Sequence, residues 1–192
     1  MRDVFNFNPG PAVLPEPVLE STSKAVLNFA NTGMSIMEVS HRSKEFDALL
    51  VETEALVAEV MGLPENYKVL FLQGGASLQF SMVPMNLLKE GMTADYIDTG
   101  SWSSKAIKEA VKVGKVNVAA SSKAEKYTRI PAASELKLTP DAVYCHITSN
   151  NTIYGTQWQS FPDTGKVPLV ADMSSDILSR TFDVKKFGLI YA

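Results

Sequence analysis

The sequence lacks the features that mark secreted and membrane-spanning proteins. It contains one cysteine, Cys145, in 192 residues, which rules out an intrachain disulfide and a zinc site built from thiolates. No apolar run is long enough to span a bilayer, and the N-terminal residues lack the apolar core of a signal peptide. We therefore expect a cytoplasmic protein with no membrane partner.

An excess of basic residues is also missing. The chain has 18 Lys and Arg against 21 Asp and Glu, which gives a formal net charge of −3. Because nucleic-acid-binding surfaces are usually basic, we expect no nucleic-acid partner. Hydrophobic residues make up 45% of the chain and charged residues 20%, the balance of a folded globular domain of ordinary size.

Strand and helix patterns alternate through most of the chain. The prolines and glycine of residues 8–11 block regular helix, so residues 1–15 are predicted to form an N-terminal arm. Helices are predicted over residues 17–29, 44–61 and 105–113, with another from Ser77. Apolar runs predict strands at residues 68–72, 96–98, 116–119, 142–147, 168–171 and 187–192. This pattern indicates an α/β fold, a three-layer sandwich with a mostly parallel central sheet.

The end of the sequence is unusual for a domain. Residues 187–192 read as an apolar strand, and no turn, helix cap or polar tail follows them. We therefore expect an incomplete domain: residues 1–15 as an arm, then residues 16–192 as a truncated large domain.

Small and polar residues follow several predicted strands, at the carboxyl ends where open α/β sheets bind ligands. The segment Gly74-Gly75-Ala76-Ser77 lies between a strand and a helix. Small residues let the backbone approach a phosphate, and the free N–H groups of a helix start attract an anion. The alternative is a tight glycine turn without a ligand. The segment matches neither the dinucleotide-binding fingerprint nor the P-loop.

Three further residues at these ends are candidate ligand contacts. Trp102, in a polar segment, either offers its ring face to a planar ligand or folds back onto the core, and Trp158 has similar surroundings. Asp172 follows an apolar strand and either pairs with a cation such as a protonated pyridine nitrogen or caps the next turn. The Thr152 hydroxyl either reaches a ligand oxygen or bonds local backbone.

A basic pair precedes the long predicted helix. The Arg42 guanidinium suits a carboxylate or phosphate through forked hydrogen bonds, although an exposed arginine is more often only solvated, and His41 lies beside it. His146 falls within a strand pattern, where we expect a core residue rather than a catalyst. No metal site is predicted.

Six short segments form an ordered set along nearly the whole chain. They are residues 5–12 (FNFNPGPA), 37–42 (MEVSHR), 71–77 (FLQGGAS), 100–102 (GSW), 148–155 (TSNNTIYG) and 171–175 (ADMSS). Each segment is moderately specific, but all six in this order are very specific. Together they resemble the phosphoserine aminotransferases, within the class V, fold-type I pyridoxal-phosphate enzymes.

The resemblance implies a PLP-dependent transferase-like large domain and the cofactor pyridoxal 5'-phosphate. Ala76 and Ser77 would bind the cofactor phosphate, and Trp102 would stack on the pyridine ring. Thr152 would contact the ring hydroxyl, and Asp172 would pair with the ring nitrogen.

The resemblance also implies a reaction and an assembly. Arg42 and His41 would bind substrate carboxylate or phosphate, at the interface of a homodimer. The reaction would pass an amino group between L-glutamate and 3-phosphooxypyruvate in serine biosynthesis, and many bacterial members are also linked to pyridoxine (vitamin B6) biosynthesis.

The match stops before two parts of the family. In the family, a Gly-Ala-Gln-Lys segment with the Schiff-base lysine follows the strand that residues 189–192 resemble, and a C-terminal small domain comes later. We therefore expect the 192-residue chain alone to be inactive and the parent protein to be an active aminotransferase.

Other functions remain open on the sequence. One is another class V enzyme, such as an alanine–glyoxylate aminotransferase or a cysteine desulfurase, although Cys145 lies in a strand pattern rather than a mobile loop. Another is a non-catalytic binding or assembly fragment of the same fold. A nucleotide-binding α/β domain is third, and the missing phosphate fingerprint argues against it.

Overall fold

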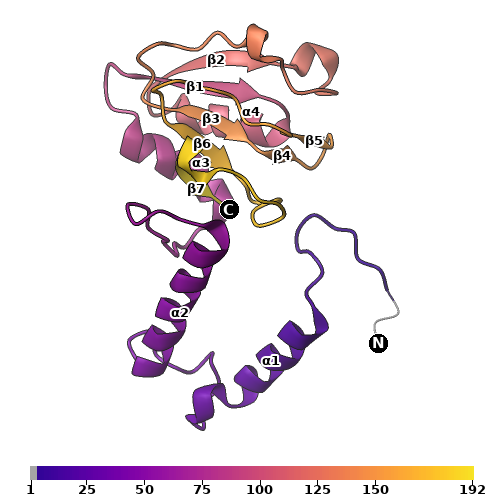
Figure 1. The fold of residues 1–192 in the computed structure, drawn as a ribbon, viewed down its shortest axis with the longest axis vertical. Helices are drawn as coiled ribbons and strands as arrows, with labels where there is room; N and C mark the ends of the chain where they lie inside the picture. The colour runs from indigo at the N-terminus through magenta and orange to yellow at the C-terminus, as the bar shows by residue number, and fades with distance from the viewer. Residues whose placement is uncertain (1–3) are drawn as a thin grey trace. The chain divides into compact units, whose positions relative to one another are not determined.

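The computed structural model describes residues 4–192, which form two compact units. The first unit extends to Leu70 and the second runs from Phe71 to Ala192. Figure 1 shows the helices α1 and α2 of the first unit and the sheet of the second.

The first unit contains two α-helices. Helix α1 (Glu16–Leu27) ends at Asn28, whose backbone is extended, so it stops two residues before the predicted end. Helix α2 (Lys44–Met61) has the predicted bounds. The Ser43 side chain accepts a hydrogen bond from the Phe46 N–H at its start, and Gly62 closes its end in the left-handed conformation. A short 3-10 helix, η1 (Phe29–Asn31), lies between the two, and neither α-helix contains a buried residue.

The second unit is built on a five-stranded parallel sheet with the strand order β2-β1-β3-β6-β7. A two-stranded antiparallel hairpin, β4 with β5, follows β3. The strands are β1 (Thr93–Asp98), β2 (Lys115–Ser121), β3 (Cys145–Thr148), β4 (Asn150–Asn151), β5 (Thr156–Gln157), β6 (Leu169–Asp172) and β7 (Phe187–Tyr191). The α/β class and the parallel sheet are as predicted.

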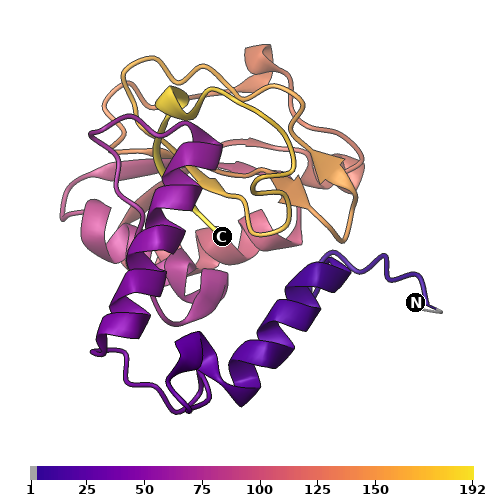
Figure 2. The ribbon, with the colours of Figure 1, turned by 60° about the horizontal axis from the view of Figure 1, so that its bottom comes forward.

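The sheet is the middle of three layers. Helices α3 (Gly75–Leu87) and α4 (Ser101–Ala110) cover one face, where Phe80 and Ala106 pack with Tyr96 and Val170. On the other face, side chains from loop segments, among them Ile130 and Phe182, pack in a cluster with Ile147 of β3. The unit also contains three short 3-10 helices, η2 (Lys123–Glu125), η3 (Ala133–Glu135) and η4 (Val184–Lys186). Figure 2 turns the molecule so that both α-helices beside the sheet can be followed.

One predicted strand is wrong. Residues 68–72 form no strand in the structure, and the side chains of Leu70, Phe71 and Leu72 are exposed. A strand exists only where another strand completes its backbone hydrogen bonds, and none pairs with this segment within the described residues. The apolar pattern was real, but the pairing that would make it a strand is missing.

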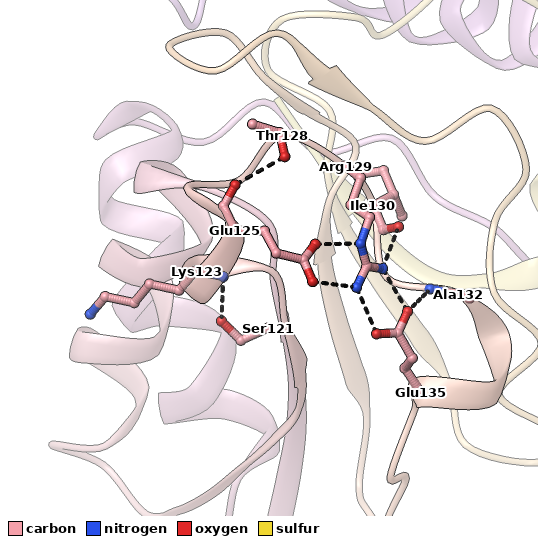
Figure 3. A network of polar contacts seen from close by, with 8 residues as sticks. All are labelled: Ser121, Lys123, Glu125, Thr128, Arg129, Ile130, Ala132 and Glu135. Atoms are coloured by element: carbon pink, nitrogen blue, oxygen red, sulfur yellow. Dashed lines mark hydrogen bonds and ion pairs between the residues drawn. The ribbon is translucent and has the colours of Figure 1, made fainter.

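The segment after β2 is held by an ion-pair network (Figure 3). The Arg129 guanidinium donates to both carboxylate oxygens of Glu125 and both of Glu135, with distances of 2.6 and 2.8 Å to Glu135. Glu135 also accepts from the Ala132 N–H. These bonds tie η2 to η3, and the hydrogen bonds from Arg129 hold the pKa of Glu135 low, at about 2.

Candidate functional site

Three polar residues end three neighbouring strands of the sheet. Asp98, Thr148 and Asp172 are the last residues of β1, β3 and β6, and all three are buried. Thr148 is the register partner of Asp172. The carboxyl edge of the sheet therefore carries a row of buried polar side chains, at the edge where open α/β sheets bind ligands.

The segment Gly74-Gly75-Ala76-Ser77 forms the start of helix α3. Gly74 is the N-cap residue with a φ of 103°, and no side chain caps the helix there. A Cβ atom on Gly74 would lie 2.2 Å from Leu78 Cδ2, so this turn requires glycine. The N–H groups of Ala76 and Ser77 in the first helical turn have no acceptor within residues 4–192. They are available to an anion.

Trp102 lies in the first turn of α4 rather than in a loop. Its indole is half-buried, and its Nε1–H donates to Thr152 Oγ1 at 3.3 Å. The Trp102 backbone N–H donates to Asn151 Oδ1 at 3.2 Å, and Asn151 Nδ2 donates to Thr99 Oγ1 at 2.9 Å. Two residues 50 positions apart in the sequence, Trp102 and Thr152, are thus joined directly.

The approach of these two segments depends on Gly100. A Cβ atom there would lie 2.4 Å from the side-chain Cγ of Asn151. Glycine therefore lets the start of α4 and the turn after β4 come together, and it places Trp102 against Thr152.

The Asp172 carboxylate is buried without a cationic partner. Its Oδ1 accepts hydrogen bonds from the Ser174 N–H at 3.0 Å and the Ser174 hydroxyl at 2.6 Å, while Oδ2 has no donor among residues 4–192. Burial raises the pKa of the Asp172 carboxyl, and the hydrogen bonds from Ser174 oppose that shift. Asp172 does cap the next turn, but one oxygen remains for a cation, which fits a protonated ring nitrogen.

A cluster of aromatic residues lies beneath the candidate site. Ala76 and Trp102 both pack against buried residues that include Tyr96, Tyr144 and Tyr191. The hydroxyls of Tyr96 and Tyr144 are 2.8 Å apart, and Tyr191 is the register partner of Asp172. The cluster therefore connects the start of α3, the start of α4 and Asp172.

His146 is part of this cluster and is a core residue, as expected. Its ring stacks on Tyr96 at 4.8 Å, and Nε2 is 2.9 Å from the Tyr191 hydroxyl. Nδ1 is buried without a hydrogen-bond partner in the described part of the chain. Burial lowers the pKa of His146 to about 3, so the ring is neutral at physiological pH.

The two other predicted residues lie in the first unit. His41 and Arg42 are exposed in the turn before α2, and the Arg42 N–H donates to Ser40 Oγ at 3.2 Å. The Arg42 guanidinium has no acceptor among residues 4–192, so it is available to an anionic ligand. Ala76, Ser77, Trp102, Thr152 and Asp172 all belong to the second unit. Trp102 bonds Thr152 directly, and Ala76 and Trp102 pack against the same buried cluster, whereas His41 and Arg42 belong to the first unit.

Sequence reasoning missed the residues that support the site. Asn151 and Ser174 hold Trp102 and Asp172 in place, yet neither was singled out. Both lie inside segments that resemble the family, which was the available signal. Trp158, the other candidate tryptophan, is buried in the core of the opposite sheet face.

Within residues 4–192, no group of His, Cys, Asp and Glu is arranged to hold a metal ion. The same part of the chain has no helix of the length and apolarity that crossing a bilayer requires.

The chain is similar to known aminotransferases. The sequence profile of the family described as "Aminotransferase class-V" matches residues 4–192. A phosphoserine aminotransferase of Desulfosudis oleivorans is 61% identical over 192 residues, which is 100% of this chain and 53% of that protein.

Two solved structures are also similar. A phosphoserine aminotransferase whose Schiff base was studied for radiation damage has a TM-score of 0.95 and 54% identity, over 98% of this chain and 53% of that one. The phosphoserine aminotransferase of Trichomonas vaginalis with PLP bound has a TM-score of 0.87 and 38% identity, over 96% and 52% of the two chains. The chain thus spans about half the length of the relatives it matches.

Proposed function

The chain belongs to the class-V aminotransferase family, and from this we infer that it is part of a pyridoxal-phosphate-dependent phosphoserine aminotransferase. The observation that carries the proposal is the buried Asp172 carboxylate, which has one free oxygen and no cationic partner among residues 4–192. Trp102 packs against the buried cluster that contains Tyr191, the register partner of Asp172. A nucleotide phosphate needs no such carboxylate, whereas a protonated pyridine does.

The cofactor would be held by residues from three strand ends. When bound, pyridoxal phosphate supplies an electron sink for the substrate's α-carbon. Asp172 Oδ2 faces the ring nitrogen in this proposal and keeps it protonated, because a nearby negative charge favours the charged form. Ser174 holds the carboxylate in place through its two hydrogen bonds.

The start of α3 binds the phosphate. Ala76 and Ser77 offer free backbone N–H groups, and the exposed Ser77 hydroxyl adds a further donor. The positive end of the α3 dipole also attracts the phosphate. The net charge of the chain is −3, so the chain as a whole does not attract an anion.

Trp102 and Thr152 act as a pair on the ring. The Thr152 oxygen accepts the Trp102 Nε1–H, so the Thr152 hydroxyl proton remains free to donate to the ring oxygen. The same bond fixes the plane of the Trp102 indole, which is then ready to stack on a planar ring.

Arg42, with His41 beside it, binds the anionic groups of the substrates, L-glutamate and 3-phosphooxypyruvate. A forked guanidinium suits both a carboxylate and a phosphate. We propose that the complete protein is a homodimer in which these residues reach an active site, and that it serves serine biosynthesis. Its location in the cytoplasm and a role in pyridoxine biosynthesis stay predictions.

The test is an intact-mass measurement after incubation with pyridoxal phosphate, borohydride reduction and dialysis. Borohydride fixes bound cofactor covalently to its lysine. The complete protein is expected to carry one pyridoxyl group and to convert glutamate and 3-phosphooxypyruvate, while the 192-residue chain, of 20.9 kDa, carries none and does not transaminate. A complete protein without the adduct contradicts the proposed cofactor.

A substrate comparison separates the proposal from its alternatives. If the complete protein converts alanine and glyoxylate faster than glutamate and 3-phosphooxypyruvate, it is a different class V enzyme. Binding without turnover by the complete protein would support a binding or assembly role.

A further inference from the structure

The Asp98 carboxylate gathers more hydrogen bonds than any role assigned so far explains. It is buried, with 6% of its surface exposed, and its two oxygens face four hydroxyl groups. Ser104 and Ser103 lie 2.8 and 3.1 Å from Oδ1, and Ser121 and Tyr127 each lie 3.0 Å from Oδ2. No cation pairs with Asp98 among residues 4–192, so these hydroxyls satisfy the buried carboxylate.

The first arm of this arrangement leads to Trp102. Ser103 and Ser104 directly follow Trp102 in the first turn of α4. The Ser103 hydroxyl also accepts the N–H groups of Thr99 and Gly100, both at 2.9 Å, and so caps the start of the helix. Asp98 therefore fixes the helical turn from which the Trp102 indole projects.

The second arm leads to Thr152. The Tyr127 hydroxyl donates to Asp98, and its ring packs on Tyr154 with centroids 4.8 Å apart. Tyr154 lies in the turn that Thr152 begins, where the Tyr154 N–H bonds the Asn151 carbonyl at 3.2 Å. Burial raises the pKa of Tyr127, which keeps its hydroxyl protonated as a donor.

The hydrogen bond from Trp102 Nε1 to Thr152 Oγ1 joins the far ends of the two arms. We propose that Asp98 is a positioning residue that sets the indole of Trp102 and the hydroxyl of Thr152 relative to each other. The inference rests on the proposed cofactor role of these two side chains. A misplacement of about 1 Å at such a pair is enough to weaken a planar ligand's fit.

The test uses the complete, cofactor-free protein and compares Asp98→Asn with Asp141→Asn. Asp141 is exposed and has no hydrogen bond to any of residues 4–192, so its amide variant controls for the loss of one charge. Asp98→Asn is expected to speed hydrogen–deuterium exchange in both residues 101–104 and residues 151–155. Tyr127→Phe keeps the ring on Tyr154 but removes the hydroxyl that bonds Asp98 and lies 3.1 Å from the Ser104 hydroxyl. It is expected to speed exchange in residues 151–155 and, to a smaller extent, in residues 101–104.

Cofactor affinity supplies a second readout. The dissociation constant for pyridoxal phosphate is expected to rise on the order of tenfold in Asp98→Asn, the size that losing one hydrogen bond to a charged group produces, and to stay unchanged in Asp141→Asn. Exchange in Asp98→Asn that matches the Asp141→Asn control at both segments overturns the proposal, and so does Tyr127→Phe exchange that changes at residues 101–104 alone. A wild-type protein that binds no cofactor contradicts the proposed function instead, while the exchange measurement still decides the role of Asp98.

Discussion

At the scale of single residues, Asp172 shows how burial changes the pKa of a candidate ligand contact. Its carboxyl loses solvation in the sheet edge, so its pKa rises. Two hydrogen bonds from Ser174 favour the ionised form and reach only one oxygen. A buried anion with an open oxygen is costly in isolation and stabilising beside a cation, so the residue is poised for a cationic ligand.

Replacing Asp172 by asparagine is expected to weaken pyridoxal phosphate binding by about 2–5 kcal/mol, because the ring nitrogen loses its buried charged partner. Absorbance titration of the complete protein with the cofactor measures this loss. Asp141→Asn, at an exposed aspartate, is the control and should bind as the wild type does. Equal affinities for the two variants would show that Asp172 does not face the ring.

His146 gives the molecule an acid-sensitive core. Its pKa is about 3 in the folded protein against an ordinary value of 6.5, because the imidazole is buried. Between those two values the unfolded chain binds the extra proton and the folded chain does not. Stability contributed by the neutral ring is therefore present above about pH 6.5 and is lost as the pH falls toward 3.

The free energy of unfolding should fall by up to about 1.4 kcal/mol for each pH unit below 6.5 because of this one group. Urea unfolding at pH 7, 6 and 5 measures the slope. His146→Phe is expected to flatten it, while His41→Gln, at the exposed histidine, leaves it as in the wild type. A slope that stays unchanged in His146→Phe would assign the acid sensitivity to other groups.

At the scale of elements, the starts of helices α3 and α4 set the geometry of the candidate site. Helix α3 begins at a glycine with positive φ, and its first N–H groups stay open. Helix α4 begins beside it against the same buried cluster. The start of α3 was predictable from its small residues, although no strand precedes it within residues 4–74. The turn of α4 that contains Trp102 was predicted as loop, because the Ser103 cap that allows it involves backbone contacts that no pattern displays.

Gly74→Ala tests the α3 start. The added methyl meets Leu78 at 2.2 Å and sits at a φ of 103°, so the first turn must distort. Gly91→Ala is the matched control, since Gly91 has a φ of 79° and no atom near a built Cβ. We expect Gly74→Ala to lower the free energy of unfolding by about 1–3 kcal/mol more than Gly91→Ala, through overpacking. Urea unfolding of both variants measures the difference. Equal losses of unfolding free energy would show that the close approach of residue 74 to Leu78 does not require glycine.

At the scale of the whole molecule, the core is distributed unevenly. Among the buried apolar side chains of residues 4–192, only Val39 belongs to the first unit. Its helices have 12 and 18 residues and bury none of them, and isolated helices of this length are marginal in water. The sheet and its two apolar clusters lie in the second unit.

Residues 71–192 are therefore expected to unfold cooperatively on their own, and residues 1–70 are not. Circular dichroism at 222 nm during a thermal ramp measures both pieces. The shorter piece should show weak helicity with a gradual loss, because it has no core to make the loss cooperative. A sharp transition in residues 1–70 would mean that the first unit carries a stability of its own.

The sequence by itself determined the α/β class, helix α2, the end of strand β6 that carries Asp172, and the glycine turn before α3. Apolar periodicity and capping residues are local, so a single segment contains the whole signal. The strand predicted at residues 68–72 failed for the opposite reason: a strand requires a neighbour, and pairing is not a property of the segment.

Only the tertiary structure decided which side chains meet. Asp98 lies 29 residues from Tyr127, Trp102 lies 50 from Thr152, and His146 lies 45 from Tyr191. These contacts join segments that are far apart in the sequence, and sequence separation does not predict distance in space. They therefore depend on strand order, register and helix placement. The residue types indicate which chemistry is available. The fold determines which partners surround each group, and these partners set its protonation state and its orientation.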